Sequence, residues 1–392
     1  MNKTTILAFS RTPIGSFLGS LSSVSAPKLA SHCINDLVGK SKVDLSTIDE
    51  VILGNVLSAG IGQAPARQAA IFAKLPKKVE CLTINKVCGS GLKAVMLADQ
   101  AIRLEDSHLI VAGGMENMSQ APYYITNMRK GNKLGHKTSL DGLVYDGLWD
   151  PYNNMHMGSC AEVLSENNNY SKSQQDAYAI ESYKKAQNAI KSGLFKNEIV
   201  KVEVQAKRGQ IKYVIDDEEP SKVDFDKIKK LKTVFKSDGT ISAANASSLN
   251  DGAATLLVSS QSYNKRYSFK PVAEIVAHCS FAHDPLHFTT APSGAIKKVL
   301  DIAGMEVSDI DLFEVNEAFS NVAMHAIDDF NLDPDSVNIF GGAVSLGHPI
   351  GASGSRILCT LLNALETKNK EVGLATLCIG GGEAAAIVVR KL

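Results

Sequence analysis

The sequence predicts an α/β protein made of two similar halves, with a long segment inserted into the first half. Apolar runs of strand length alternate with stretches at helical spacing, which is typical of a sheet covered by helices. The order of elements in the first third of the chain returns in the last third. At 392 residues the chain exceeds the size of one simple core, so a duplicated or multidomain architecture is expected.

The first half is expected to alternate between strand and helix. Residues 4–9 form an apolar run of strand length, and the small and apolar residues of 27–38 recur at helical spacing. The other elements expected before residue 119 are a strand over 51–56, a helix over 64–73, a helix directly after Cys88, and a strand over 109–112 that ends at Gly113 and Gly114. This alternation implies a largely parallel sheet.

Residues 119–248 have a different composition, rich in polar residues, glycines and basic clusters. Helices are expected over 160–167 and 173–192, the second with Ser173 as its N-cap and Gly193 as its stop. We expect this segment to lie over the core as an insertion, because loops on a rigid scaffold commonly carry binding function. The predicted domains are therefore a first half over 1–118 and 249–270, an inserted loop domain over 119–248, and a second half over 271–392.

The last third repeats the plan of the opening. A glycine-rich turn over residues 341–354 precedes a helix over 356–365 and a strand over 373–378, which ends at three glycines over 380–382. The same order of reactive side chain, helix, strand and glycine turn begins at Cys88. The shared order indicates two similar halves packed together.

Composition narrows the class of protein. Lys plus Arg and Asp plus Glu both number 41, so no global charge favours nucleic acid or a membrane surface as a partner. The seven cysteines form no C-x-x-C pair, which favours free thiols in a reducing compartment over a disulfide framework or a zinc site. The N-terminus lacks the pattern of a targeting peptide, and no apolar stretch reaches transmembrane length. We expect a soluble cytoplasmic protein.

Cys88 lies where a strand gives way to a helix. Gly89 and Gly91 allow the backbone to crowd the sulfur. A thiol at a helix N-terminus faces free N–H groups and the positive end of the helix dipole, which favour the thiolate. The sequence therefore predicts a nucleophile here, and the alternative is a small buried apolar residue.

Four other side chains are candidates for the same chemistry. His348 stands in a glycine-rich loop and could draw a proton from a thiol, or simply hold the loop. Cys378 precedes three glycines whose N–H groups could bind an oxyanion, or it is a buried structural thiol. Asn316 begins an apparent helix and would also serve as an N-cap. His156 lies in the insertion, beside a ligand path or within a stabilised loop. No metal-ligand spacing or nucleotide motif is present in the sequence.

Taken together, these blocks resemble the thiolase family. The match covers essentially the full chain in the order of the family, and four blocks make it specific, namely residues 85–95, 316–319, 341–354 and 378–382. Cys88-Gly89-Ser90-Gly91 and His156-Met157-Gly158 resemble the biosynthetic branch that acts on acetoacetyl-CoA. The resemblance implies a five-layer αβαβα fold built from two similar halves, with an inserted loop domain that serves CoA binding and oligomerisation.

The resemblance also implies roles for individual residues. Cys88 would attack an acyl-CoA and carry the acetyl group as a thioester. His348 would take the proton of Cys88 and, with a water held by Asn316, stabilise a thioester oxygen. Cys378 would remove the α-proton of a second acetyl-CoA. The backbone N–H groups of Cys88 and Gly380 would form a second oxyanion hole.

Binding residues follow from the same resemblance. The acyl and pantetheine ends of the substrate would meet His156, Met157, Ser247 and Phe319. Where relatives contact adenine through an arginine and a serine, this sequence has Pro220 and Lys227, so the adenine end is held differently. One branch binds a potassium ion near the pantetheine loop, and the residues compatible with such a site are Tyr183, Ala243, Ala244, Ala246 and Val344.

The implied activity is an acyltransferase reaction that condenses two acetyl-CoA to acetoacetyl-CoA and CoA, and its reverse, with no cofactor beyond the CoA esters. The basic stretch 129–137 resembles the region through which tetrameric members associate, so a homotetramer is expected, or otherwise a homodimer. The alternatives are a degradative thiolase for longer 3-ketoacyl-CoA esters and, from another class, a non-catalytic acyl-CoA carrier.

Overall fold

The computed structural model describes residues 3–205 and 209–392. In the first half, five strands lie in the order β4-β3-β5-β12-β1. Their bounds are β1 Thr4–Arg11, β3 Glu50–Gly54, β4 Glu80–Ile84, β5 Leu109–Asn117 and β12 Asn250–Ser260. The helices of this half are α1 Ala26–Ser41, α2 Pro65–Phe72 and α3 Ser90–Arg103, and α7 Gln261–Tyr267 leads out of it.

The second half repeats this order. Its strands lie as β14-β15-β16-β13, and an isolated bridge between Phe313 and Val337 occupies the edge that β4 fills in the first half. The bounds are β13 Ala273–Ala282, β14 Leu312–Val315, β15 Val372–Ile379 and β16 Glu383–Lys391, with helices α8 Ala291–Ala303, α9 Ser320–Phe330, α10 Ala343–Leu346 and α11 Ser353–Lys368. Two residue pairs between β1 and β13 join both halves into one sheet of ten strands, with the short β2 Gly15–Ser16 paired to β12.

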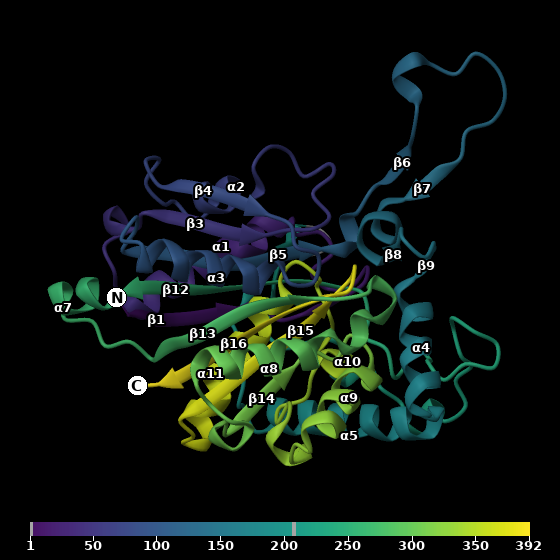
Figure 1. Cartoon of the computed structure of the whole chain (residues 1–392). Coiled ribbons are helices and arrows are strands. Elements are labelled where there is room, and N and C mark those ends of the chain that lie inside the picture. Colours follow the sequence, from purple (N-terminus) through teal and green to yellow (C-terminus); the bar gives the residue numbers. More distant parts are fainter. Residues whose placement is uncertain (1–2, 206–208) are drawn as a thin grey trace.

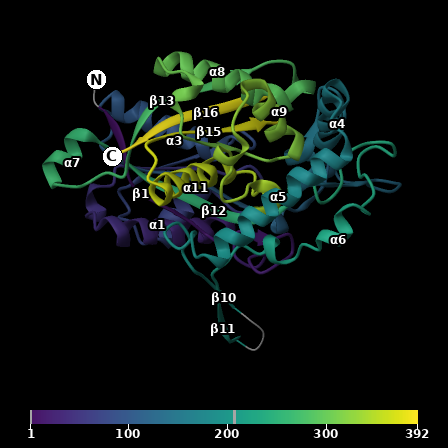
Figure 2. The same ribbon diagram turned by 90° about the horizontal axis from the view of Figure 1, so that it is seen from below.

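The strands labelled in Figure 1 are covered by three layers of helices, and the view in Figure 2 separates these layers, with α8 on one side, α3 and α11 in the middle and α1 on the other side. Helices α3 and α11 pack against each other in the centre, between the two sheets. Helices α1 and α2 cover the outer face of the first half, and α8 covers that of the second. The apolar core divides accordingly into a central cluster and two outer clusters. The predicted five-layer αβαβα fold is confirmed.

Several local expectations were wrong. The sheet is mixed, because β12 and β16 run antiparallel to both of their neighbours and only the β3–β4, β3–β5 and β14–β15 pairs are parallel. Strand β5 continues through Gly113 and Gly114, since both glycines lie against other backbone. The N-cap of α5 is Ser171, which forms a capping box with Gln174, and not Ser173.

The inserted segment spreads over both halves. Helices α4 Met157–Asn168 and α5 Lys172–Lys191 contact α9 and α10 of the second half. The hairpin of β6 Tyr123–Ile125 and β7 Ser139–Asp141 projects from the body of the molecule (Figure 1). A second hairpin, of β10 Val202–Gln205 and β11 Ile211–Val214, projects from a different part of the surface (Figure 2). The insertion also contains the short strands β8 Trp149–Asp150 and β9 Met155–His156 and the short helix α6 Phe225–Ile228.

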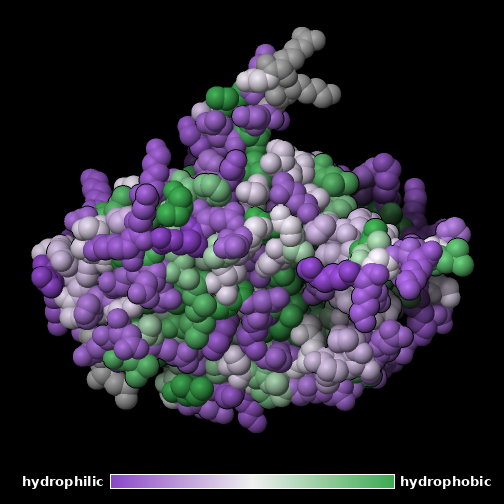
Figure 3. All heavy atoms as spheres, turned by 90° about the horizontal axis from the view of Figure 1, so that it is seen from above, coloured by the Kyte–Doolittle hydropathy of each residue, from purple (hydrophilic) through white to green (hydrophobic). Residues whose placement is uncertain are grey.

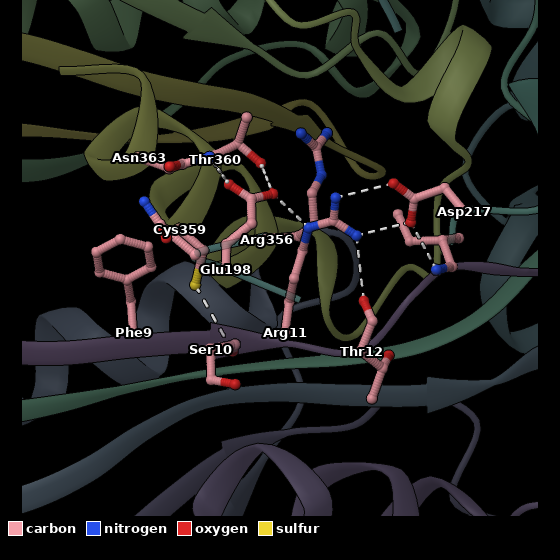
Figure 4. A network of polar contacts seen from close by, with 12 residues as sticks. Phe9, Ser10, Arg11, Thr12, Glu198, Asp217, Arg356, Cys359, Thr360 and Asn363 are labelled. Carbon is pink, nitrogen blue, oxygen red and sulfur yellow. Dashed lines mark hydrogen bonds and ion pairs between the residues drawn. The ribbon is translucent and has the colours of Figure 1, made fainter. Parts of the chain in front are cut away.

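A buried ionic network ties the insertion to the core (Figure 4). Arg11 of β1 is fully buried and donates to Glu198 at 2.5 Å and to both carboxylate oxygens of Asp217 at 2.7 and 2.8 Å. Thr360 and Asn363 of α11 also donate to Glu198, at 3.1 and 2.9 Å. The paired charges satisfy one another where water has no access.

None of the helices in residues 3–205 and 209–392 combines the length and apolar content needed to cross a bilayer.

Candidate active site

One cavity of about 500 Å³ gathers most of the predicted site residues. Its lining includes Cys88 from the first half, His348 and Gly380 from the second half, and side chains of the insertion. The predicted binding residues among its walls are His156, Met157, Ser247 and Phe319. Two predicted residues, Asn316 and Cys378, are fully buried directly behind the lining.

Cys88 stands at a constrained turn between β4 and α3. Val87 has a φ of 45°, which costs a β-branched residue on the order of 1–3 kcal/mol and is found mainly at functional sites. Ser90 fixes the turn, because its hydroxyl accepts from the Lys86 N–H at 2.8 Å and donates to the Val87 carbonyl at 2.7 Å. Gly89 has no space for a Cβ, which would overlap the side chain of Ile379. The two halves therefore meet beside Cys88.

The resting state of Cys88 differs from the sequence expectation. Burial raises the pKa of Cys88 to about 11, while the backbone N–H groups of Gly380 and of Cys88 itself act in the opposite direction. Helix α3 begins two residues later, at Ser90. Desolvation therefore outweighs the helix terminus, and Cys88 is a thiol at neutral pH that needs a base to become a nucleophile.

His348 has the properties of that base. Its Nδ1 lies 2.6 Å from the hydroxyl of Ser353, the first residue of α11, and 3.5 Å from the Asn316 amide nitrogen. Its Nε2 has no partner among the described residues. Burial lowers the pKa of His348 to about 3, and the nearby Arg356 cation acts in the same direction. The ring is therefore neutral at physiological pH and able to accept a proton.

Side chains, rather than a regular ladder, hold the turn that bears His348. The Asn250 side-chain oxygen accepts from the His348 N–H at 2.8 Å. Glu317 accepts from the Val344 N–H at 3.1 Å and from Ser182 at 2.7 Å. Sequence reasoning missed both acceptors, since an Asn at a strand start and a Glu in a loop carry no distinctive pattern.

Asn316 is not an N-cap, because α9 begins only at Ser320 with Phe319 before it. It lies in the loop after β14, fully buried, and its N–H donates to the Thr376 carbonyl at 3.0 Å. Its side-chain oxygen has no partner in the described part of the chain. The amide can therefore serve a substrate oxygen or a bridging water beside His348.

Cys378 lies near the end of β15, against Ala384 of β16. It is fully buried, and it packs in an apolar cluster with Met157, Phe288 and Phe319. Burial raises the pKa of Cys378 well above its usual range, and the neighbouring Cys88 sulfur adds to this effect. The second thiol is thus protonated at rest, close to the first and at the apolar end of the cavity.

The apolar end is shaped by aromatic rings. Phe235 stacks on His156 with ring centroids 4.8 Å apart, and meets the edge of Phe319 at 6.3 Å. The His156 Nδ1 accepts from the Gly158 N–H at 3.0 Å and caps α4, so this predicted residue has a structural contact as well as a place in the cavity wall. Phe235 and Phe288 were missed, because isolated phenylalanines in a sequence read as ordinary core residues.

The remaining predicted residues divide into two groups. Ser247, Ala243 and Ala246 line the cavity on a loop whose Ser247 N–H donates to the Ala318 carbonyl at 3.0 Å. Tyr183 and Val344 contact each other in a separate small apolar cluster. Ala244 is buried but outside the cavity lining.

Comparison with known proteins places this geometry in a family. The family description "Thiolase, N-terminal domain" matches residues 4–262, and "Thiolase, C-terminal domain" matches 269–391. The acetyl-CoA acetyltransferase of Schizosaccharomyces pombe is 48% identical over 388 residues, covering 99% of this chain and 98% of its own. The mitochondrial acetyl-CoA acetyltransferase of Bos taurus is 47% identical over 393 residues, covering 100% and 92%.

Solved structures agree. The Acat5 thiolase of Ascaris suum, in complex with coenzyme A, superposes with a TM-score of 0.94 at 42% identity, covering 100% of both chains. The acetyl-CoA acetyltransferase of Bacillus anthracis superposes with a TM-score of 0.97 at 36% identity, covering 100% of this chain and 99% of its own.

Proposed function

The chain belongs to the thiolase family, and from this premise we propose that it is an acetyl-CoA acetyltransferase that joins two acetyl-CoA into acetoacetyl-CoA and free CoA, and catalyses the reverse thiolysis. It is an acyltransferase enzyme whose substrates are CoA esters. The observation that carries the proposal is that Cys88 and His348 line one cavity, and that Cys378 is buried behind its wall beside Cys88.

In the first half-reaction, the Cys88 sulfur attacks the carbonyl carbon of acetyl-CoA while His348 accepts the thiol proton. The carbon–sulfur bond to CoA then breaks, and the CoA sulfur leaves as a thiol with the proton of Cys378, which becomes a thiolate while His348 keeps the proton of Cys88. The product is an acetyl thioester on Cys88. A neutral imidazole is required for this step, and the lowered pKa of His348 supplies it.

In the second half-reaction, the Cys378 thiolate removes a proton from the methyl group of a second acetyl-CoA. The resulting carbanion attacks the acetyl carbonyl, and the Cys88 sulfur leaves and recovers its proton from His348, so that both thiols and the imidazole return to their resting state. The oxygen charge of one thioester would be stabilised by His348 and Asn316, and that of the other by the N–H groups of Cys88 and Gly380. Each such donor is typically worth on the order of 10²–10³ in rate.

The experiment that tests the function is CoA-dependent cleavage of acetoacetyl-CoA beside a longer 3-ketoacyl-CoA, with Cys88→Ala as control. The aromatic wall of the cavity supports preference for the four-carbon substrate. Equal or faster cleavage of the longer ester would instead favour a degradative thiolase. Binding of CoA esters without any cleavage would favour a carrier.

We also propose that the protein is a homotetramer built from dimers. Strand β4 ends the sheet with one edge free of any strand partner in the described chain, and Leu82 on it is 42% exposed. Viewed from above, hydrophobic patches lie between hydrophilic groups (Figure 3). The projecting β6–β7 hairpin carries Leu134, 94% exposed, near its tip. Light scattering would distinguish four copies from two.

Three further proposals complete the assignment. The domain division given above is supported by the two family regions, which meet between residues 262 and 269. A cytoplasmic location is supported by the seven free cysteines, which suit a reducing compartment, and fractionation would test it. A potassium ion near Val344 would be held by neutral oxygens, namely the backbone carbonyls of Ala243, Ala244, Ala246 and Val344 with the phenol of Tyr183, a donor set suited to a hard cation of low charge. Replacing KCl with NaCl in the assay tests it.

A further inference from the structure

A buried carboxylate that the mechanism does not use lies beside the cavity. Glu116 is near the end of β5 and is fully buried. One of its oxygens accepts from the Asn55 side-chain amide at 2.7 Å and the Leu57 N–H at 3.2 Å. The other accepts from the Val56 N–H and the Gly351 N–H, both at 3.0 Å. Four donors from two distant segments therefore end on one side chain.

These two segments belong to different halves. Residues 55–57 follow β3 in the first half, and Gly351 lies three residues after His348 in the second. The halves touch through backbone at this point, since a Cβ on Gly351 would lie 2.7 Å from the Glu116 carboxylate and from the Met115 carbonyl. The turn that bears His348 therefore packs directly against β5, with no space for an added side-chain atom at Gly351.

The segments that Glu116 holds also form the wall against which the nucleophile packs. Val56 and Leu57 from one segment meet Ile350 from the other in an apolar cluster, and Cys88 packs on this cluster. Met118 and Leu143 complete it. Ile350 also lines the cavity, two residues after His348 in the chain. The position of His348 relative to Cys88 thus depends on the contact between these two segments, and both segments are hydrogen-bonded to Glu116.

We propose that Glu116 is a positioning residue that locks the His348 turn of the second half onto the Cys88 side of the first, so that the imidazole can reach the thiol proton. This inference rests on the proposed function in giving His348 the role of base. A carboxylate is required because both of its oxygens are acceptors, and each oxygen here accepts from two of the four donors. A glutamine would direct its own N–H₂ group at two of them.

The test is the rate at which iodoacetamide alkylates Cys88, followed by peptide mapping. This reaction needs the thiol proton to be withdrawn but needs no CoA substrate. It is run at pH 8, because burial raises the pKa of Glu116 to about 7 and the carboxylate is then mostly ionised. We expect Glu116→Gln to slow alkylation about tenfold or more, since a displacement of about 1 Å in such a constellation can cost 10²-fold.

A double-mutant comparison separates positioning from general loosening. If Glu116 acts through His348, Glu116→Gln adds nothing to His348→Ala, and the double variant reacts at the rate of His348→Ala alone.

A matched control is Glu162→Gln. Glu162 of α4 is also buried and accepts from the Thr240 and Ile241 N–H groups at 2.8–2.9 Å, just before the loop that carries the cavity-lining Ser247. The variant Glu162→Gln is expected to raise the KM for CoA. In contrast, Glu116→Gln is expected to lower the acetylation rate and to leave the KM for CoA within about twofold of the parent value.

The proposal is overturned if Glu116→Gln alkylates at the parent rate, or if its effect simply multiplies that of His348→Ala. It is also overturned if both glutamine variants change the KM for CoA alike. Should Glu116→Gln fail to fold, Asn55→Ala removes one donor and must slow alkylation in the same direction by a smaller factor. A parent protein that acetyl-CoA never acetylates would refute the proposed function, while the alkylation rates would still judge Glu116.

Discussion

Substituting Gly114 by alanine tests whether the two halves must meet closely for catalysis. A Cβ at Gly114 would lie 2.9 Å from the carbonyl carbon of Gly351 and 3.1 Å from the Cα of Ala352, and it would overlap the Gly351 oxygen. Comfortable carbon contacts are about 3.5–4.0 Å, so the turn that bears His348 must retreat by about 1 Å. The obstacle is backbone on both sides, so no side-chain rotation relieves it.

Two consequences of Gly114→Ala can be measured separately. Overpacking of this kind costs about 1–3 kcal/mol of stability, which urea unfolding reports. A displacement of about 1 Å between base and nucleophile lowers kcat by about 10²-fold. The assay is thiolysis of acetoacetyl-CoA at a temperature where the variant is fully folded by near-UV circular dichroism.

Gly252→Ala provides a control that touches the same turn. Its Cβ would lie 3.3 Å from Cγ of the Pro349 ring, a contact that a small adjustment relieves. We expect kcat to fall less than about threefold, because the backbone of the turn does not move. If Gly114→Ala retained the kcat of this control, the close approach of the halves would not set the catalytic geometry.

Three further outcomes are expected. Cys88→Ala abolishes turnover, whereas Cys378→Ala still accepts an acetyl group on Cys88 from acetyl-CoA but forms no carbon–carbon bond; condensation at the parent rate would refute the two-thiol mechanism. In His348→Ala, which lacks the proposed base, alkylation of Cys88 rises about tenfold per pH unit from pH 7 to 10, because burial raises the pKa of Cys88 to about 11; a plateau near pH 9 would contradict the desolvation argument. Arg11→Met costs about 3–5 kcal/mol in urea unfolding, because Glu198 and Asp217 remain buried without their cation; a loss below about 1 kcal/mol would show that water reaches the network.

The two-half architecture could be predicted from the sequence because the same order of strands and helices occurs twice in the chain. The order of strands and helices around α3 and α11 reflects apolar periodicity, which local sequence expresses directly. The direction of β12 and β16 was not predictable in this way, since strand direction depends on how distant segments return to the sheet. The capping box of Ser171 and Gln174 does have a local sequence pattern, Ser-x-x-Gln, and this pattern rather than Ser173 marks the start of α5.

The candidate site was foreseen as a set of reactive side chains and not as an electrostatic environment. Cys88 and His348 were expected from their glycine-rich surroundings, but the sequence suggested a thiolate where burial favours the thiol. Burial depends on the packing of both halves, which no local stretch contains. The same reason hid Glu116, whose four donors come from segments about 60 and 235 positions away in the chain.

The pairing of α3 with α11 bears on when the protein becomes reactive during its synthesis. The two helices hold equivalent places in the two halves, and Cys88 precedes one as His348 precedes the other. A chain still on the ribosome, with only its first half emerged, has the nucleophile but neither the histidine nor the second thiol. Under the proposed mechanism, a nascent chain therefore cannot transfer acetyl groups between thioesters until the segment through Cys378 has been added and has folded.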